Sequence, residues 1–292
     1  MSEIPEPTDV RPSPIAGSWY PGDQKTLAES IDHYLEMAGT GVPLEGRVVG
    51  LIVPHAGHRY SGAVAARAFK LIQGLQPATV AVLSPLHGLA SSAVLTSGHD
   101  AFATPLGAIP INRELQTRFE QELERGHGIA VERVRQDQEH ALEIELPFLQ
   151  RALSRPFQLL AIMLRDQSER TARAVGETLA RVLEAGTLIV GSSDLSHFYP
   201  ERVALVLDQE MIRRMEHFDP AGVINAEKEG VGFACGRGAV AAVMWACQAL
   251  GANRVQALEH TTSAAATGDK SSVVGYASAV IYQSKGSGLD AA

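Results

Sequence analysis

Three apolar segments of the chain each end in side chains that can bind a metal ion or move a proton. His55 follows the first segment, His87 follows the second, and Asp194 and His197 follow the third. The segments span residues 48–53, 78–83 and 187–191. Continuous apolar runs of this kind are typical of buried parallel strands. Because ligands of open α/β sheets bind outside the carboxyl ends of the strands, we expect these four side chains to meet in one crevice.

A cysteine is a further candidate ligand. Cys235 lies in a glycine-rich turn directly before a helix expected at about residues 236–250. Unpaired N–H groups and the dipole at a helix N-terminus lower the pKa of a thiol, and Arg237 would add to this effect. The resulting thiolate binds metals or acts as a nucleophile. The alternative is a small buried cysteine in a turn, and Cys247, in the middle of the helix, is expected to be a core residue.

His140 is a candidate acid–base residue. It stands where a helix is predicted to start within residues 137–149, with Glu139 beside it and Glu143 one turn further on. A carboxylate one turn away can fix the tautomer of an imidazole and raise its basicity. The alternative is a helix N-terminus that is rich in acidic residues for capping. Asp194 and His197 would share a face if their turn were helical, so they could also act together.

These side chains are compatible with more than one metal. Two histidines and a cysteine suit zinc or copper, whereas two histidines and a carboxylate with open positions are typical of non-haem ferrous iron. The residues alone leave open whether Cys235 or Asp194 completes the set. A phosphate-binding loop is not indicated, because no Lys-Ser/Thr follows a GxxxxG pattern. A Ser-His-Asp hydrolase is disfavoured, because Ser192 and Ser193 lack the glycine elbow.

The composition favours one globular domain. Of 292 residues, 45% are hydrophobic and 20% are charged, which allows a sizeable core. The formal net charge of −8 argues against a nucleic-acid partner. No signal peptide and no membrane-spanning run is recognisable, so we expect no membrane association. Because the chain has only two cysteines, we expect no disulfide framework. We expect the protein to reside in a reduced, cytoplasmic environment.

The alternation of apolar runs and helical patterns predicts an α/β fold of three layers. We expect a mostly parallel central sheet with helices on both faces, followed by C-terminal strands at 254–261 and 273–282 that are antiparallel. One domain is expected over residues 11–283, with a disordered N-terminus at 1–10 and a flexible tail at 284–292. Further helices are predicted at about 24–37, 63–72, 112–125, 168–184 and 203–217.

Seven short motifs resemble those of the MEMO protein family and occur in the family's order over about residues 11–282. They are Ala-Gly-Ser-Trp-Tyr-Pro at 16–21, Pro-His-Ala-Gly at 54–57, Ser-Gly at 61–62, Thr-Pro-Leu-Gly at 104–107, Glu-His-Ala-Leu-Glu at 139–143, Ser-Ser-Asp-Leu-Ser-His at 192–197 and Cys-Gly-Arg at 235–237. Any one motif is weak, but seven in register make a specific match. The family fold resembles the LigB-type extradiol dioxygenases, which hold ferrous iron with two histidines and a carboxylate.

The resemblance implies that His55, His87 and Cys235 are the metal-binding positions. The further side chains that it places in or near the same pocket, our candidates for catalysis, are Asp194, His197 and His140. It implies iron(II) or copper as the metal, ahead of zinc. Classical ring cleavage is not implied, because a cysteine stands where the dioxygenases have a carboxylate. Bacterial and archaeal members of the family are associated with a radical SAM partner protein.

Three functions are compatible with this site. The first is a dioxygenase-like, metal-dependent oxidoreductase that acts on an unknown small molecule. The second is a module that binds a metal or a peptide without catalysis, and the third is a zinc-dependent hydrolase. The chain also departs from the family pattern. His58 replaces the usual aromatic residue after Pro-His-Ala-Gly, and Leu86 and Gly88 flank His87 where relatives often have Ser and a second His. Both departures could change the metal preference.

Overall fold

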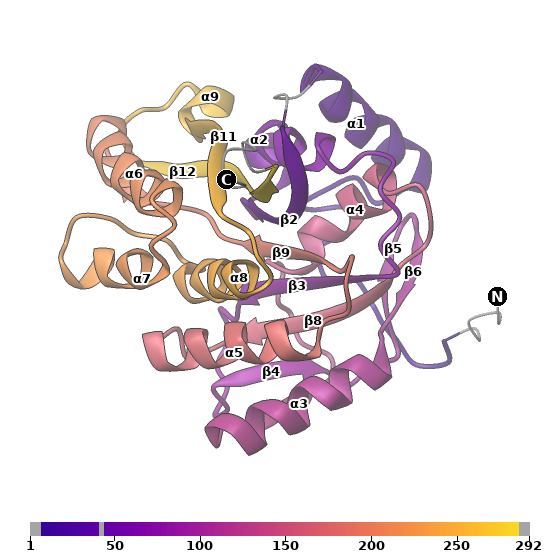
Figure 1. The fold of residues 1–292 in the computed structure, drawn as a ribbon. Helices are drawn as coiled ribbons and strands as arrows, with labels where there is room; N and C mark the ends of the chain where they lie inside the picture. Colours follow the sequence, from indigo (N-terminus) through magenta and orange to yellow (C-terminus); the bar gives the residue numbers. More distant parts are fainter. Residues whose placement is uncertain (1–6, 41–43, 286–292) are drawn as a thin grey trace.

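A computed structural model describes residues 7–40 and 44–285 of the chain. It confirms a single α/β fold in which helices cover both faces of a central sheet (Figure 1). The strand order of this sheet is β10-β12-β2-β9-β3-β8-β4-β7, and β11 pairs with β12.

Four parallel strands form the centre of the sheet. They are β2 (Gly46–Val53), β9 (Leu188–Ser192), β3 (Thr79–Pro85) and β8 (Gln158–Leu164). Most of their residues are buried, because helices cover both faces, and this explains why the sequence shows continuous apolar runs and no alternation. The carboxyl ends of the four strands therefore lie at one edge, where His55 and His87 follow β2 and β3.

Antiparallel strands extend this parallel centre on both sides. The predicted antiparallel pair is confirmed as β11 (Arg254–Thr262) and β12 (Val273–Ser284), and β12 is also antiparallel to β2. On the other side, β4 (Val94–Ser97) is antiparallel to β8 and parallel to β7 (Val131–Val134). The short β10 (His197–Tyr199) is antiparallel to β12. The sheet as a whole is therefore mixed.

The helices lie in two layers. One layer contains α3 (Arg113–His127), α5 (Glu169–Val182), α6 (Glu201–Glu216), α7 (Pro220–Lys228) and α8 (Arg237–Ala249). The other contains α1 (Gln24–Met37), α2 (His58–Lys70) and α4 (Leu146–Ala152). Polar side chains cap the N-termini of several helices: at α3, Asn112 accepts a hydrogen bond from the Leu115 N–H, and at α5, Ser168 accepts one from the Thr171 N–H.

Several local features differ from the sequence prediction. Helix α7 was not predicted, and α2 begins at His58, before the predicted residue 63. The segment 137–142 is not the start of a helix but an irregular loop, followed by a 3₁₀ turn at Glu143–Glu145 and then α4. The reason is that the Glu139 carboxylate accepts hydrogen bonds from the backbone N–H groups of His140 and Ala141, which competes with helix formation.

A small second sheet was also not predicted. It consists of β1 (Val10–Arg11), β5 (Ala101–Thr104) and β6 (Gly107–Pro110). Through β1 it attaches the N-terminal segment to the body of the domain. The short helix α9 (Ala264–Thr267) connects β11 to β12.

The predicted flexible ends fall partly outside the described residues, which exclude 1–6 and 286–292. Within the described part, Val10 belongs to β1, and the Asp9 carboxylate lies 2.7 Å from His99 Nδ1. Ser284 is the last residue of β12. Among residues 7–40 and 44–285, no helix has both the length and the apolar character that crossing a membrane requires.

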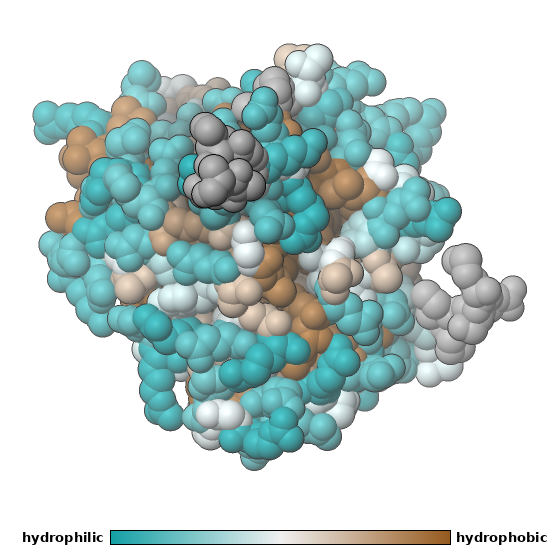
Figure 2. Space-filling view, in the orientation of Figure 1, coloured by the Kyte–Doolittle hydropathy of each residue, from teal (hydrophilic) through white to brown (hydrophobic). Residues whose placement is uncertain are grey.

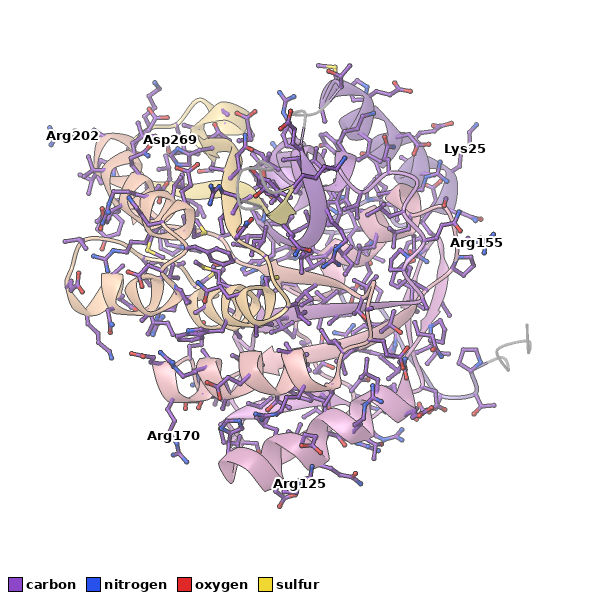
Figure 3. All side chains as sticks on the ribbon, viewed as in Figure 1. Lys25, Arg125, Arg155, Arg170, Arg202 and Asp269 are labelled. Atoms are coloured by element: carbon purple, nitrogen blue, oxygen red, sulfur yellow. The ribbon has the colours of Figure 1, made fainter. Side chains whose placement is uncertain are left out.

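The face drawn in Figure 2 is mostly hydrophilic. Figure 2 shows apolar residues on one face in separate small areas, one of them over α6, whose exposed apolar side chains are Val203, Leu205 and Val206. Charged side chains such as Arg125, Arg170 and Arg202 project outward from the ribbon (Figure 3). Several buried titratable groups, in contrast, gather around the carboxyl edge of the parallel strands and define the candidate site: His55, Glu139, Glu145 and Asp194.

Candidate metal centre

Two histidines and a cysteine converge at the carboxyl edge of the parallel strands. His55 follows β2, His87 follows β3, and Cys235 lies just before α8. Their potential ligand atoms all lie within 4.8 Å of one another, and Cys235 Sγ is 3.1 Å from His55 Nε2. Ligand atoms on a tetrahedral metal ion are roughly 3.5 Å apart. The structure thus brings together the three side chains that the sequence selected, at a spacing that fits one ion.

A buried hydrogen-bond chain orients His55. Its Nδ1 is 3.0 Å from Ser192 Oγ, which in turn lies 2.6 Å from the Ala141 carbonyl and 2.8 Å from Glu145 Oε1. The carbonyl can only accept, so Ser192 donates to it and accepts from His55 Nδ1–H. Burial raises the pKa of Glu145 well above its usual value. The lone pair of His55 Nε2 is left facing Cys235.

A carboxylate orients His87. Glu139, which is almost fully buried, lies 2.9 Å from His87 Nδ1 and accepts a hydrogen bond of 2.6 Å from the His87 backbone N–H. The hydrogen bond with Glu139 raises the pKa of His87 against the opposing effect of burial. Carboxylates paired in this way with histidine ligands fix the tautomer and increase basicity. His87 Nε2 is therefore the nitrogen available for an ion.

His140 lies in the same cluster but in a different environment from the one expected. Its ring packs between His87, at a centroid distance of 4.8 Å, and Trp19, at 4.2 Å. With His87 and Glu139 it forms a second group of potential ligand atoms within 4.8 Å. Burial lowers the pKa of His140 to about 4, so the ring is neutral near pH 7. The expectation that Glu143 holds this ring is wrong.

Glu143 belongs instead to a buried network that we call the N-terminal clamp: Arg11, Ser13, Tyr20, Asp137 and Glu143. Arg11 Nη1 lies 2.5 Å from Glu143 Oε2, and Arg11 Nη2 lies 2.7 Å from Asp137 Oδ1. The other oxygen of Glu143 accepts hydrogen bonds from the Tyr20 hydroxyl, at 2.7 Å, and from Ser13. The clamp holds the N-terminal segment against loop 137–142. It therefore brings Trp19 and His140 together.

Asp194 and His197 line the same cavity without sharing a helical face, because His197 already belongs to β10. Asp194 Oδ1 accepts a hydrogen bond of 2.7 Å from the His55 backbone N–H, and burial raises the pKa of Asp194 to about 7. His197 Nδ1 donates to the Leu195 carbonyl at 2.7 Å. Burial also lowers the pKa of His197. Both residues therefore contact the cavity beside the three converging side chains.

The expectation of a low pKa for Cys235 is wrong. Burial raises the pKa of this thiol, and the nearby Asp194 carboxylate adds to the effect. The favourable contribution of the Gly236 N–H at the start of α8 is smaller. Arg237 does not compensate, because its guanidinium pairs with Glu227 at 2.7 Å.

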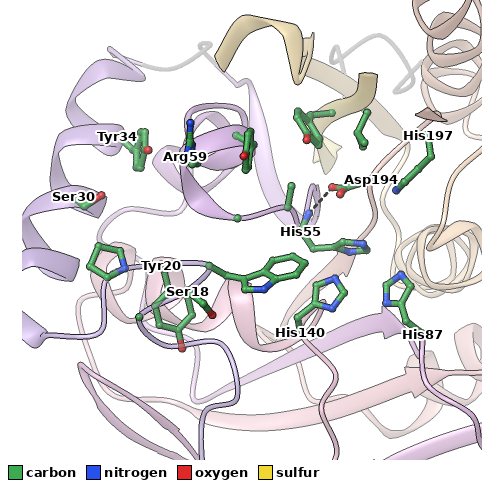
Figure 4. A pocket seen from close by; sticks show the side chains of 18 residues that line it. Ser18, Tyr20, Ser30, Tyr34, His55, Arg59, His87, His140, Asp194 and His197 are labelled. Atoms are coloured by element: carbon green, nitrogen blue, oxygen red, sulfur yellow. Dashed lines mark hydrogen bonds between the residues drawn. The ribbon is translucent and has the colours of Figure 1, made fainter. Parts of the chain in front are cut away.

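The cluster opens into a cavity of about 770 Å³ with aromatic walls. Figure 4 shows His55, His87 and His140 together at one end, and Arg59 and Tyr34 at the other. The aromatic lining residues are Trp19, Tyr20, Tyr34, Tyr60 and Tyr276. Sequence reasoning missed Arg59, Tyr34, Tyr60 and Tyr276, because nothing in their local pattern distinguishes them from helix or strand residues.

His58 is not part of the cavity wall. Its ring is buried near Tyr20 and Phe148, at centroid distances of 5.4 and 4.8 Å, and its Nε2 donates to the Ile144 carbonyl at 3.2 Å. Within the described part of the chain, His58 Nδ1 has no hydrogen-bond partner. This departure from the family pattern therefore places an imidazole in the core behind the site.

The fold and the site together define an α/β protein with a histidine–cysteine cluster at the carboxyl edge of its parallel strands. The family model described as Memo-like protein matches residues 11–280. A MEMO1 family protein of Nitrosopumilus maritimus is 34% identical over 271 residues, which cover 91% of this chain and 98% of that protein. One of Methanopyrus kandleri is 34% identical over 278 residues, covering 91% and 96% respectively. The chain belongs to the MEMO family.

Proposed function

We propose that the protein binds iron(II) or copper through His55, His87 and Cys235 and uses the ion in a redox reaction on a small molecule held in the cavity. The observation that carries this proposal is the convergence of the three side chains within 4.8 Å. Two imidazoles and a soft thiolate are a donor set for a transition metal, not for calcium or magnesium. An ion bound there would supply electron transfer.

The surrounding residues support a metal site more than a structural cluster. Both histidines have their Nδ1 atoms engaged, by Ser192 and by Glu139, so their Nε2 atoms are the ones directed to an ion; His55 Nε2 lies 3.1 Å from the Cys235 thiol, whose proton the ion would replace. A thiol whose pKa is raised by burial loses its proton when a cation replaces that proton. Metal binding should therefore release a proton and tighten with increasing pH.

Two further histidines that line the cavity contribute to the proposed reaction. His197 is neutral near pH 7 and has its Nδ1 engaged, so its Nε2 can accept a proton from a ligand. His140, with a pKa of about 4, is a weaker base. We assign His140 the role of a flat wall, together with Trp19, that excludes water from the ligand.

The proposal is tested by metal titration of anaerobically purified protein with iron(II), copper(I) and zinc(II). His55→Ala, His87→Ala and Cys235→Ala should each weaken binding by at least about tenfold, because each removes a direct ligand. His217→Ala is the matched control, because His217 is exposed on the far end of α6 and should leave the affinity unchanged. Equal affinities in wild type and all three site variants would refute the metal centre.

Two further measurements separate the redox proposal from its alternatives. Loss of the ultraviolet absorption of catechol-type compounds, in the presence of iron and oxygen, would support a redox enzyme. Stable metal binding without such turnover would favour the binding module. Stoichiometric zinc that survives chelation would favour the hydrolase, because a His/His/Cys set with an open position also activates water on zinc.

A further inference from the structure

The end of the cavity remote from the histidines carries a positive charge. Arg59 lines the cavity there, beside Tyr34, while the histidines lie at the opposite end (Figure 4). Its guanidinium stands over the ring of Tyr60, 4.9 Å from the ring centroid. A guanidinium stacked on an aromatic ring keeps its N–H edges available for hydrogen bonds.

The charge of Arg59 is not compensated. Within residues 7–40 and 44–285 the arginine has neither an ion pair nor a side-chain hydrogen bond, although the chain as a whole has a net charge of −8. Many other arginines of the protein, such as Arg11, Arg67 and Arg133, do pair with carboxylates. Asp194, the carboxyl group that lines the same cavity, bonds to the His55 backbone instead.

Hydroxyl groups at the same end could complete an anion site. Tyr34 and Ser30 line the cavity there, and neither side chain has a hydrogen-bond partner within the described part of the chain. A single guanidinium matches one negative charge, and its planar edge fits the two oxygens of a carboxylate. A doubly charged group would need a second cation, and the described lining residues include no further lysine or arginine.

We propose that Arg59 binds the carboxylate of an organic acid whose apolar body lies against the aromatic walls of the cavity. The inference rests on the proposed function in placing the other end of this ligand at the metal centre. A cavity of about 770 Å³ has the size that encloses a small organic molecule. The aromatic side chains Trp19, Tyr60 and Tyr276 supply the apolar contact.

A pair of matched probes tests the proposal without any metal. 3-Phenylpropionate and 3-phenylpropanol have the same ring and chain, and only the first carries a carboxylate. In calorimetric titrations of the metal-free full chain, the acid should bind at least about tenfold more tightly than the alcohol, because a hydrogen bond to a charged group is worth that factor. Arg59→Met should abolish the preference.

Arg202→Met is the matched control. Arg202 is also an exposed arginine, but it projects outward from α6 and does not line the cavity (Figure 3). This variant should keep the full preference for the acid. Equal binding of acid and alcohol by the wild type, absence of binding of both, or an unchanged preference in Arg59→Met would overturn the proposal.

The titrations with the acid and the alcohol test the carboxylate site independently of the metal titrations. Arg59→Met should bind iron(II) or copper(I) as the wild type does, because Arg59 belongs to neither group of potential ligands. A failed probe experiment with intact metal binding would refute the carboxylate site alone. A retained preference for the acid in a protein that binds no metal would refute the metal centre alone.

Discussion

Two buried polar clusters lie side by side in this protein and differ in how their groups are paired. In the N-terminal clamp, Arg11 faces Glu143 and Asp137, and each charge has an opposite charge within hydrogen-bond distance. In the candidate metal centre, His55 and His87 have one nitrogen engaged and the other facing a shared space. Burial costs free energy in both clusters, but only the clamp offsets that cost internally.

The difference separates a positioning role from a binding role. A cluster in which one guanidinium already bridges both carboxylates leaves no polar group waiting for a ligand, whereas imidazole nitrogens that face a shared space can bind a cation. The two clusters are joined through Glu139, whose carbonyl accepts a hydrogen bond from Arg11 and whose carboxylate holds His87. We therefore expect changes in the clamp to affect folding most, and changes in the centre to affect metal affinity most.

The largest effect is expected for Arg11→Met. This change leaves Glu143, which is fully buried, without a compensating charge, and breaking one side of a buried pair costs about 3 to 5 kcal/mol. The free energy of unfolding in urea measures this loss. The double variant Arg11→Met/Glu143→Gln should recover part of it, because the fully buried carboxylate is then absent and only the carboxylate of Asp137 lacks its partner. A loss below about 1 kcal/mol would mean that the clamp behaves as a surface ion pair.

His58, which lies behind the site, should make the metal-free protein sensitive to acid. Burial lowers the pKa of His58 to about 4, against about 6.5 in the unfolded chain. The unfolded chain therefore binds a proton that the folded chain does not, so stability is present above pH 6.5 and is lost as the pH falls toward 4. Between pH 7 and pH 5 this loss is about 2 kcal/mol.

His58→Phe should remove this part of the acid sensitivity. The free energy of unfolding of wild type and variant is measured by denaturation at pH 7 and at pH 5. The loss between the two pH values is then compared for the two proteins, and the contributions of the site histidines cancel because both proteins contain them. His217→Phe is the control for an exposed imidazole. Identical pH dependence of wild type and His58→Phe would contradict the assignment of a buried neutral ring.

Glu139→Gln should affect the metal centre more than the fold. The amide can still accept hydrogen bonds from the backbone of the loop, but it cannot stabilise a basic His87 as a carboxylate does. Loss of such a partner typically weakens metal binding by about tenfold, and competitive titration with a chelating indicator measures it. Glu132→Gln, at an exposed site on β7, should change nothing.

The smallest effect on affinity is expected for Asp194→Asn. Its amide oxygen can still accept the hydrogen bond from the His55 backbone, and Asp194 does not belong to either close group of potential ligand atoms. The absorption spectrum of the bound metal should change while the affinity falls less than in Glu139→Gln. Complete loss of the metal would instead identify Asp194 as a ligand.

The convergence of His55 and His87 could be predicted from sequence because parallel strands end at one edge of a sheet. The hydrogen-bond partners of these two histidines could not be predicted in this way. Ser192, at the end of β9, reaches His55 across the sheet, and Glu139 reaches His87 from a loop whose conformation depends on distant side chains. An arginine in a proline-rich N-terminus gives no sign that it becomes buried, as Arg11 does.

Local patterns also failed where tertiary contacts decide the structure. The acidic pattern around His140 resembles a helix start, but Glu139 binds the local backbone and Glu143 is drawn into the clamp. The low pKa expected for Cys235 from its place at a helix N-terminus is overruled by burial and by Asp194, which no local pattern places beside it.

The wide separation of the site residues along the chain has a consequence for biosynthesis. The walls of the cavity run from Trp19 to Tyr276, and the thiol of Cys235 lies 180 residues after His55. A nascent chain lacks part of this constellation until the segments that contain Cys235 and Tyr276 have left the ribosome. Binding of an ion at the proposed site would therefore have to wait until Cys235 has left the ribosome and has packed beside His55.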